Sequence, residues 1–279
     1  MKQRLPGPKL TRREAIAAAI GATAVACCNR SWAAATRLDN AVQIGPFQCR
    51  FSGSVDEVIA DLEGLRGLEA ELRRVLALSP CRETIEVLVL DDSRSHRELI
   101  RERHPLAPDR RALFVKQDGQ STVYAYRQRD LAIDLRHECT HALLHSDLPM
   151  VPLWLDEGLA EYFEAAPDER PRGPAHLTAL RWDLRLGRML TVEQLEKKHE
   201  LSELTQLDYR FAWAWAHYML HGPESATEAL WAFLGKLRKS EPPGLLSERL
   251  SEDGSSLEAR FAAHFRHWPS VLKQAKLAG

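Results

Sequence analysis

The chain has 279 residues, of which 44% are hydrophobic and 28% are charged, a composition typical of globular proteins. Its 38 Lys and Arg residues nearly balance its 39 Asp and Glu residues. Residues 1–35 hold six basic residues against one acidic residue, so the rest of the chain is acidic, which argues against nucleic acid as a partner. No unbroken apolar run of about 18 residues follows this N-terminal segment, and we expect no membrane span there.

The first 35 residues resemble a bacterial export signal. Arg12 and Arg13 precede an Ala-rich apolar run, which is similar to a twin-arginine signal, and the general secretion route is the alternative. Two cleavage sites fit the sequence: one after the small residues 33–35, and one before Cys27, which would then carry a lipid anchor. We therefore predict an exported, periplasmic or cell-envelope protein, attached to a membrane only if Cys27 is lipidated. A poorly ordered Ala-rich arm is the other interpretation of this segment.

Three segments predict a small mixed sheet with helices in the first part of the remaining chain. Residues 41–51 alternate apolar and polar side chains late in the run, with Phe47, Cys49 and Phe51 on one side, which predicts a half-buried strand. A capping box at Ser54 opens an apolar-striped helix that ends before Pro80. Residues 84–90 are rich in β-branched and apolar side chains, which predicts a buried strand.

A β-hairpin is predicted next, because Asp118-Gly119 lies between two strand-like runs. Its second strand leads almost directly into the following helix. An edge strand at this place can pair with an extended peptide, main chain to main chain. Alternatively, the hairpin simply packs on the sheet.

Residues 146–279 are predicted to be mostly helical. The helices are expected at 176–187, 191–199, 208–222, 225–238 and 255–267. Capping boxes mark three of these starts, at Thr191, Ser225 and Ser255. The sequence therefore predicts an α+β fold in one domain, 36–279, with a small mixed sheet and helices in 36–145 and a helical part in 146–279.

Cysteine usage fits an exported protein. Cys49 and Cys81 would be able to pair in an oxidising compartment, but a sequence does not show whether two backbones approach closely enough, so the pairing stays open. Cys139 is expected in the core, because it lies about 200° around its helix from the histidines on either side.

His137, Glu138 and His141 form an H-E-x-x-H pattern on a predicted helix. Two imidazoles four residues apart lie on one helix face and can bind one metal ion. Glu138 can take a proton from a water on that metal. His145 lies about 12 Å along the helix axis from His137, which is too far for both to bind one ion.

Two carboxylates follow this motif after a Pro-containing loop. Glu157 is the candidate third ligand, because catalytic zinc takes three protein ligands and keeps one position open. Glu161 shares the helix face of Glu157 and is expected to accept the second ring N–H of a ligating histidine. Without the upstream motif, both residues would be interpreted as solvated helix charges.

The motif and the sequence Trp-Leu-Asp-Glu-Gly-Leu-Ala-Glu at 154–161 resemble the gluzincin zinc metallopeptidases, of a bacterial branch similar to peptidase clan MA. This resemblance implies a zincin-like fold with the metal site at the junction of its two parts. It implies Zn²⁺ held by His137, His141 and Glu157, and a zinc-bound water that Glu138 activates to hydrolyse peptide bonds. Peptides or proteins would then be the substrates.

Tyr209 opens a predicted helix, and gluzincins often place such a tyrosine after their zinc motifs, where it donates to the oxyanion. The alternative is a packing residue at a helix end. His217 and His221 are also four residues apart, but no Glu follows the first, and we interpret them as residues of the core edge or the surface. An aminopeptidase is disfavoured, because the sequence lacks the Gly-x-Met-Glu-Asn motif of that branch.

The sequence thus predicts an exported zinc-dependent peptidase. One alternative is a zinc-stabilised, catalytically silent envelope domain for binding or scaffolding. Another is a non-peptidase hydrolase that uses the same metal. The natural substrate and the oligomeric state are not predicted.

Overall fold

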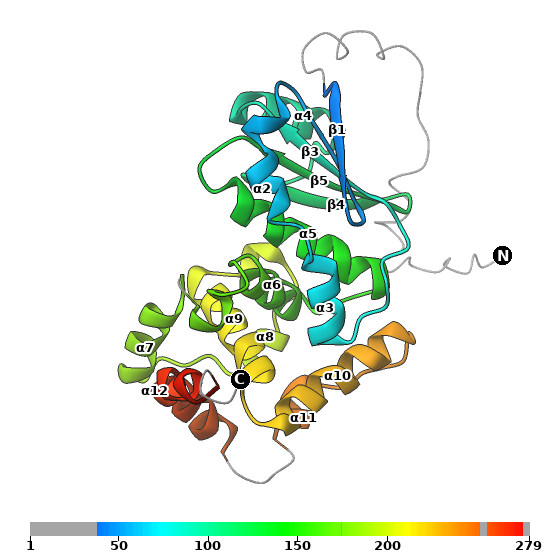
Figure 1. The fold of residues 1–279 in the computed structure, drawn as a ribbon. Helices are drawn as coiled ribbons and strands as arrows, with labels where there is room; N and C mark the ends of the chain where they lie inside the picture. The colour runs from blue at the N-terminus through cyan, green and yellow to red at the C-terminus, as the bar shows by residue number, and fades with distance from the viewer. Residues whose placement is uncertain (1–37, 174, 252–255, 276–279) are drawn as a thin grey trace, which may run out of the picture. The chain divides into compact units, whose positions relative to one another are not determined.

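The computed structural model describes residues 38–173, 175–251 and 256–275, which fall in one unit, Leu38–Gly279. The predicted export signal, with its lipidation position Cys27, lies outside these residues. Among the helices that are described, none combines the length and the apolarity needed to cross a membrane. Figure 1 shows the strands gathered in one part of this unit and most helices in another.

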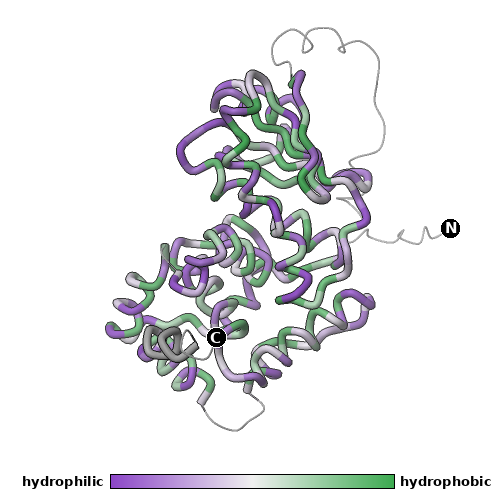
Figure 2. The backbone as a smooth tube through the Cα atoms, viewed as in Figure 1, coloured by the Kyte–Doolittle hydropathy of each residue, from purple (hydrophilic) through white to green (hydrophobic). Residues whose placement is uncertain are grey.

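A five-stranded mixed sheet forms the first part, in the order β1-β2-β3-β5-β4. The central strands β2, β3 and β5 run parallel, and β1 and β4 pair antiparallel at the two edges. The strands are β1 (Asn40–Ile44), β2 (Phe47–Phe51), β3 (Ile85–Leu90), β4 (Leu113–Gln117) and β5 (Gln120–Tyr126). With the helices that follow, this sheet confirms the predicted α+β fold. Apolar residues follow the strands in Figure 2.

The half-buried strand predicted from the alternation at 47–51 is confirmed as β2, whose residues are alternately buried and exposed. Its extension back to residue 41 is wrong, because the chain turns back at Gly45. Gly45 has a φ of 56°, which permits a two-residue turn, and Ile44 pairs with Phe47 across it. The predicted hairpin at Asp118-Gly119 is confirmed, and both turn residues have positive φ, 52° and 80°.

The predicted long helix after Ser54 is broken into shorter pieces. A 3-10 turn, Val55–Glu57, comes first, followed by α2 (Ile59–Glu63) and α3 (Leu68–Leu76). Gly67, with a φ of 83°, separates the two helices. Val55 is exposed rather than part of the apolar stripe, because it lies in the 3-10 turn.

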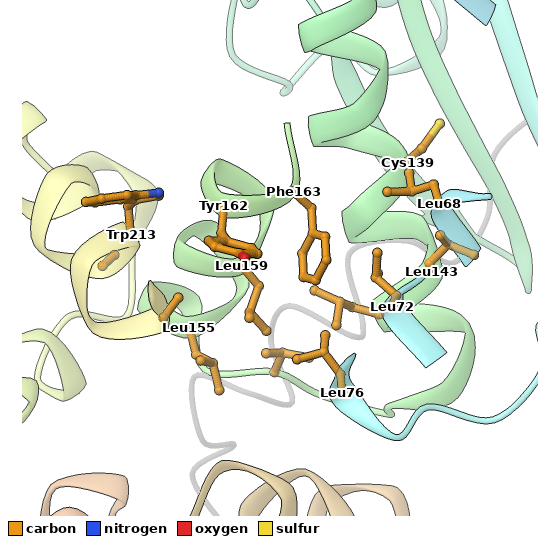
Figure 3. Close-up of a cluster of buried hydrophobic side chains, with 14 of the residues drawn as sticks. Leu68, Leu72, Leu76, Cys139, Leu143, Leu155, Leu159, Tyr162, Phe163 and Trp213 are labelled. Atoms are coloured by element: carbon orange, nitrogen blue, oxygen red, sulfur yellow. The ribbon is translucent and has the colours of Figure 1, made fainter. Parts of the chain in front are cut away.

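Helix α5 (Leu131–Asp147) joins the sheet to the helical part. It packs on β4 and β5 on one side and on α6 (Leu153–Phe163) on the other, and α6 packs in turn on α9 (Gln206–His221). Figure 3 shows α3, α5 and α6 sharing one apolar cluster, with Leu72, Leu143 and Phe163 between them. The sheet part and the helical part therefore have a continuous core.

Helix α4 (Ser93–Arg103) packs on β3 and β5 of the sheet. The remaining helices belong to the helical part. They are η3 (Arg170–Arg172), α7 (Leu177–Arg185), α8 (Val192–Glu196), η4 (Leu201–Glu203), α10 (Glu224–Arg238), α11 (Leu246–Leu250) and α12 (Leu257–Ala275). The capping box at Thr191 is confirmed. The one at Ser225 is wrong, because α10 begins at Glu224 after Pro223 and has no side-chain cap. Ser255 lies outside the described residues.

The three cysteines of the described chain are free, so Cys49 and Cys81 form no disulfide here. Cys49 is fully buried in the sheet, and burial raises the pKa of its thiol to about 12. Cys139 is also fully buried, as the helix geometry predicts.

Candidate metal site

Helices α5 and α6 bring together His137, His141 and Glu157. The Nε2 atoms of His137 and His141 lie 3.6 Å and 3.9 Å from Oε2 of Glu157. The two imidazole rings meet edge to face, with their centroids 5.0 Å apart, as expected for residues on successive turns of one helix. The three side chains that the sequence spacing predicts to lie together are therefore close to one another in the structure.

The arrangement fits a metal ion. Ligand atoms of the three residues lie within 4.8 Å of one another. A tetrahedral ion with bonds of about 2.1 Å needs its ligand atoms roughly 3.4 Å apart, close to the distances found. Oε2 of Glu157 is buried and accepts no hydrogen bond, although a buried carboxylate oxygen normally has a partner. A cation between these residues would supply that partner.

The second nitrogen of each histidine ring meets a different carboxylate. Nδ1 of His137 lies 2.9 Å from Glu164, and Nδ1 of His141 lies 2.9 Å from Asp156. These contacts leave both Nε2 atoms facing Glu157, which is how carboxylates orient histidine ligands. The role predicted for Glu161 is corrected, because Glu161 instead contacts Nε2 of His176 at 2.6 Å.

The electrostatics of the site favour positive charge at its centre. Burial alone would lower the pKa of His137, but the carboxylates of Glu157 and Glu164 raise it well above the usual value. Burial alone would raise the pKa of Glu157, but the two histidines lower it. A metal ion competes with protons for the same imidazole nitrogens. The carboxylates around the histidines therefore stabilise either a protonated imidazole or a bound metal ion.

Glu138 lies beside the three candidate ligands and is held by the sheet. Its Oε2 accepts a hydrogen bond of 2.7 Å from the backbone N–H of Phe114, in the edge strand β4. The carboxylate lines a cleft of about 650 Å³ together with His137 and Glu157. The strand therefore fixes the carboxylate next to the candidate metal position, where a carboxylate is able to act as a general base.

Tyr209 lines the same cleft from the first turn of α9. Nη2 of Arg110, from the loop before β4, donates a hydrogen bond of 3.2 Å to its phenolic oxygen. Burial raises the pKa of Tyr209, with a further contribution from Glu157. The phenol therefore stays protonated and can act as a hydrogen-bond donor.

Two other histidine groups lie apart from the candidate ligands. His145 binds the second oxygen of Asp156 at 2.9 Å, so it supports the site without reaching its centre. His217 is fully buried rather than at the core edge or the surface, and it donates to the carbonyl of Pro171 at 3.0 Å. His221 contacts the hydroxyl of Tyr162 at 2.6 Å.

Sequence reasoning missed Asp156, Glu164 and Arg110. Glu164 carries a usable signal, because Glu157, Glu161 and Glu164 follow the i, i+4, i+7 spacing of one helix face. Asp156 and Arg110 have no such signal, since the role of Asp156 depends on how α6 crosses α5 and that of Arg110 on the conformation of a loop.

No protein-family model matches the chain, and no curated protein matches it.

Proposed function

We propose that this chain is an exported, zinc-dependent peptidase of gluzincin type. One observation carries the proposal: a buried Glu157 oxygen without a hydrogen bond faces two imidazole nitrogens, with the Glu138 carboxylate beside them. Two histidines and one glutamate are a usual ligand set for catalytic zinc. The export signal predicted from the sequence of residues 1–35 supports the proposed location of the enzyme.

Zinc, when bound, supplies a Lewis acid that activates water and polarises the scissile carbonyl. Glu138 takes the proton of the attacking water and passes it to the nitrogen of the leaving amine. The N–H of Phe114 keeps this carboxylate in place during both transfers. Tyr209 donates a hydrogen bond to the carbonyl oxygen as it gains charge.

The position of β4 supports a peptide as the substrate. β4 is an edge strand, so one side of it pairs with β5 and the other is not covered by a strand. Phe114 in this strand contacts Glu138 directly. An extended peptide that pairs with β4 would therefore bring its backbone close to the general base.

Glu138→Gln tests the mechanism. We expect this variant to bind one zinc ion per chain as the wild type does, because Glu138 is not a ligand. Hydrolysis should fall about 100-fold to 10 000-fold, the usual contribution of a general base. His141→Ala should lose both zinc and hydrolysis. Zinc content is measured by elemental analysis, and cleavage by mass spectrometry of a digested peptide library.

A chelator should stop the cleavage, and added zinc should restore it. Full activity of Glu138→Gln on a peptide that the wild type cleaves would refute the mechanism. If the zinc-loaded wild type cleaves no peptide, the alternative of a zinc-stabilised binding or scaffolding domain is favoured.

A further inference from the structure

The charged side chains around the cleft are mostly paired with one another. Arg111 binds Asp134 at 3.0 Å, and His176 binds Glu161 at 2.6 Å. Arg210 forms an ion pair with Asp183 on the wall of the same cleft. Such pairs satisfy each other and leave little driving force for a charged ligand.

Arg110 differs from these residues. It is partly buried in the cleft wall, and within the described chain its guanidinium makes a single hydrogen bond, the one to Tyr209. None of the ion pairs found among the described residues involves it. An arginine has five N–H donors in a planar fork, so most of the donors of Arg110 are available to a ligand.

The hydrogen bond with Tyr209 holds the guanidinium of Arg110 in the cleft wall. Arg110 donates to the phenolic oxygen, so the one hydroxyl hydrogen of Tyr209 stays available for the carbonyl oxygen of the scissile bond. The remaining donors of the guanidinium lie in a planar fork, which matches the two oxygens of a carboxylate.

We propose that the guanidinium of Arg110, held by Tyr209, binds a carboxylate of the substrate, so that the enzyme selects peptides with an acidic group near the scissile bond. This inference rests on the proposed peptidase function. The carboxylate has two possible sources, a free C-terminus and an Asp or Glu side chain. Either would lie in the same cleft as His137 and Glu157, within reach of the catalytic groups.

Peptide binding to the zinc-loaded Glu138→Gln variant tests the proposal without hydrolysis. Three pools of short N-acetylated random peptides are offered to the immobilised protein. The first lacks Asp and Glu and ends in a free carboxylate. The second is the same pool as C-terminal amides. The third is amidated and contains Asp and Glu. Retained peptides are quantified by mass spectrometry.

We expect either the first or the third pool to be retained about 10-fold to 100-fold more than the second, which has no carboxylate. This is the range for a hydrogen bond to a charged group. Retention of the first pool identifies a C-terminal carboxylate. Enrichment of Asp or Glu at one position of the third pool identifies a side chain. The proposal would be overturned if all three pools were retained equally, or if no pool were retained.

Arg110→Gln in the same background should abolish the preference for acid. Arg111→Gln is the matched control, because it removes the same charge from the next residue, whose guanidinium is already bound to Asp134. If both variants lose the preference equally, the overall charge of the cleft is responsible and the proposal is wrong. Arg110→Lys keeps the positive charge but not the planar fork of the guanidinium, so it should retain only part of the preference for acid. It takes the place of Arg110→Gln in the assay if Arg110→Gln does not fold.

Kinetics separate this role from stabilisation of the oxyanion. With Glu138 present, Arg110→Gln should raise KM for the acidic substrate more than it raises KM for the amide of that substrate. An equal fall of kcat on both substrates would contradict carboxylate recognition. Because the binding assay needs no turnover, a protein that selects acidic peptides but cleaves none supports this inference while refuting the peptidase function.

Discussion

Asp156 is shared between two histidines. One of its oxygens meets Nδ1 of His141 and the other meets Nε2 of His145, both at 2.9 Å. Burial alone would raise the pKa of this carboxyl, but the two imidazoles lower it strongly, so it stays ionised at neutral pH. Asp156 therefore holds the His141 ring with Nε2 directed at the candidate metal position.

Asp156→Asn is expected to keep the fold and weaken zinc affinity about 10-fold to 100-fold, the usual effect of losing a carboxylate that orients a histidine ligand. Competition with a coloured chelator measures this affinity. His145→Gln is the control: it removes the outer partner of Asp156 but keeps the contact with His141, so its effect should be smaller. An unchanged affinity in Asp156→Asn would show that the ring of His141 is positioned by its packing instead.

At the scale of single residues, the sequence predicts the candidate metal ligands but not the carboxylates that hydrogen-bond to them. The spacing of His137, His141 and Glu157 follows from helix periodicity and from the length of one loop. Which carboxylate meets which ring nitrogen depends on the rotation and crossing of α6 relative to α5. Glu161 illustrates this, because it lies on the predicted helix face and yet binds His176 from the following segment.

At the scale of elements, the close approach of α6 to α9 is set by a glycine. A Cβ atom at Gly158 would lie 2.4 Å from the carbonyl oxygen of Ala212, inside the backbone of α9. The residue before it is the candidate ligand Glu157. The contact between these helices therefore positions one side of the candidate metal site.

Gly158→Ala should force the two helices apart and lower the free energy of unfolding by about 1–3 kcal/mol, as overpacking does in other cores. It should also weaken zinc binding through Glu157. Gly235→Ala in α10 is the control, since a Cβ there meets no atom within 4 Å. That change should stabilise the helix by up to about 1 kcal/mol. Urea unfolding of both variants provides the comparison, and equal stability would contradict the proposed packing constraint.

Turn chemistry decides which elements the sequence predicts well. Asp118-Gly119 suits positive φ at both turn residues and stands between two clear strands, so its hairpin is correctly predicted. Gly45 also makes a turn, but the alternation of apolar residues continues on its far side and suggests one strand. Gly67 breaks a helix whose apolar stripe continues through α2 and α3, so periodicity alone hides the break.

At the scale of the whole molecule, a buried histidine and a half-buried one connect α12 to the rest of the helical part. His217 of α9 donates through Nε2 to Pro171, so its Nδ1 accepts a hydrogen bond from Nε2 of His264 in α12, at 3.1 Å. Trp268 donates to the same Pro171 carbonyl and packs its ring 4.4 Å from that of His217. This arrangement requires a neutral His217.

Burial lowers the pKa of His217 far below its usual value and lowers those of His221 and His264 to about 4. In the unfolded chain these histidines titrate near pH 6.5. Between about pH 6.5 and 4 the unfolded state therefore binds more protons than the folded state, and stability falls as the pH falls through this range. Each histidine contributes a slope of up to about 1.4 kcal/mol per pH unit.

Urea unfolding at pH 7 and pH 5 measures this loss, and His264→Gln isolates the part that comes from the cluster. Glutamine can still donate to His217 but does not titrate, so the variant should lose less stability than the wild type over the same interval. The difference between the two proteins cancels the other titrating groups, including those of the metal site. Identical losses in both proteins would mean that the contact between α9 and α12 does not depend on neutral histidines, and that the acid sensitivity of the fold arises elsewhere.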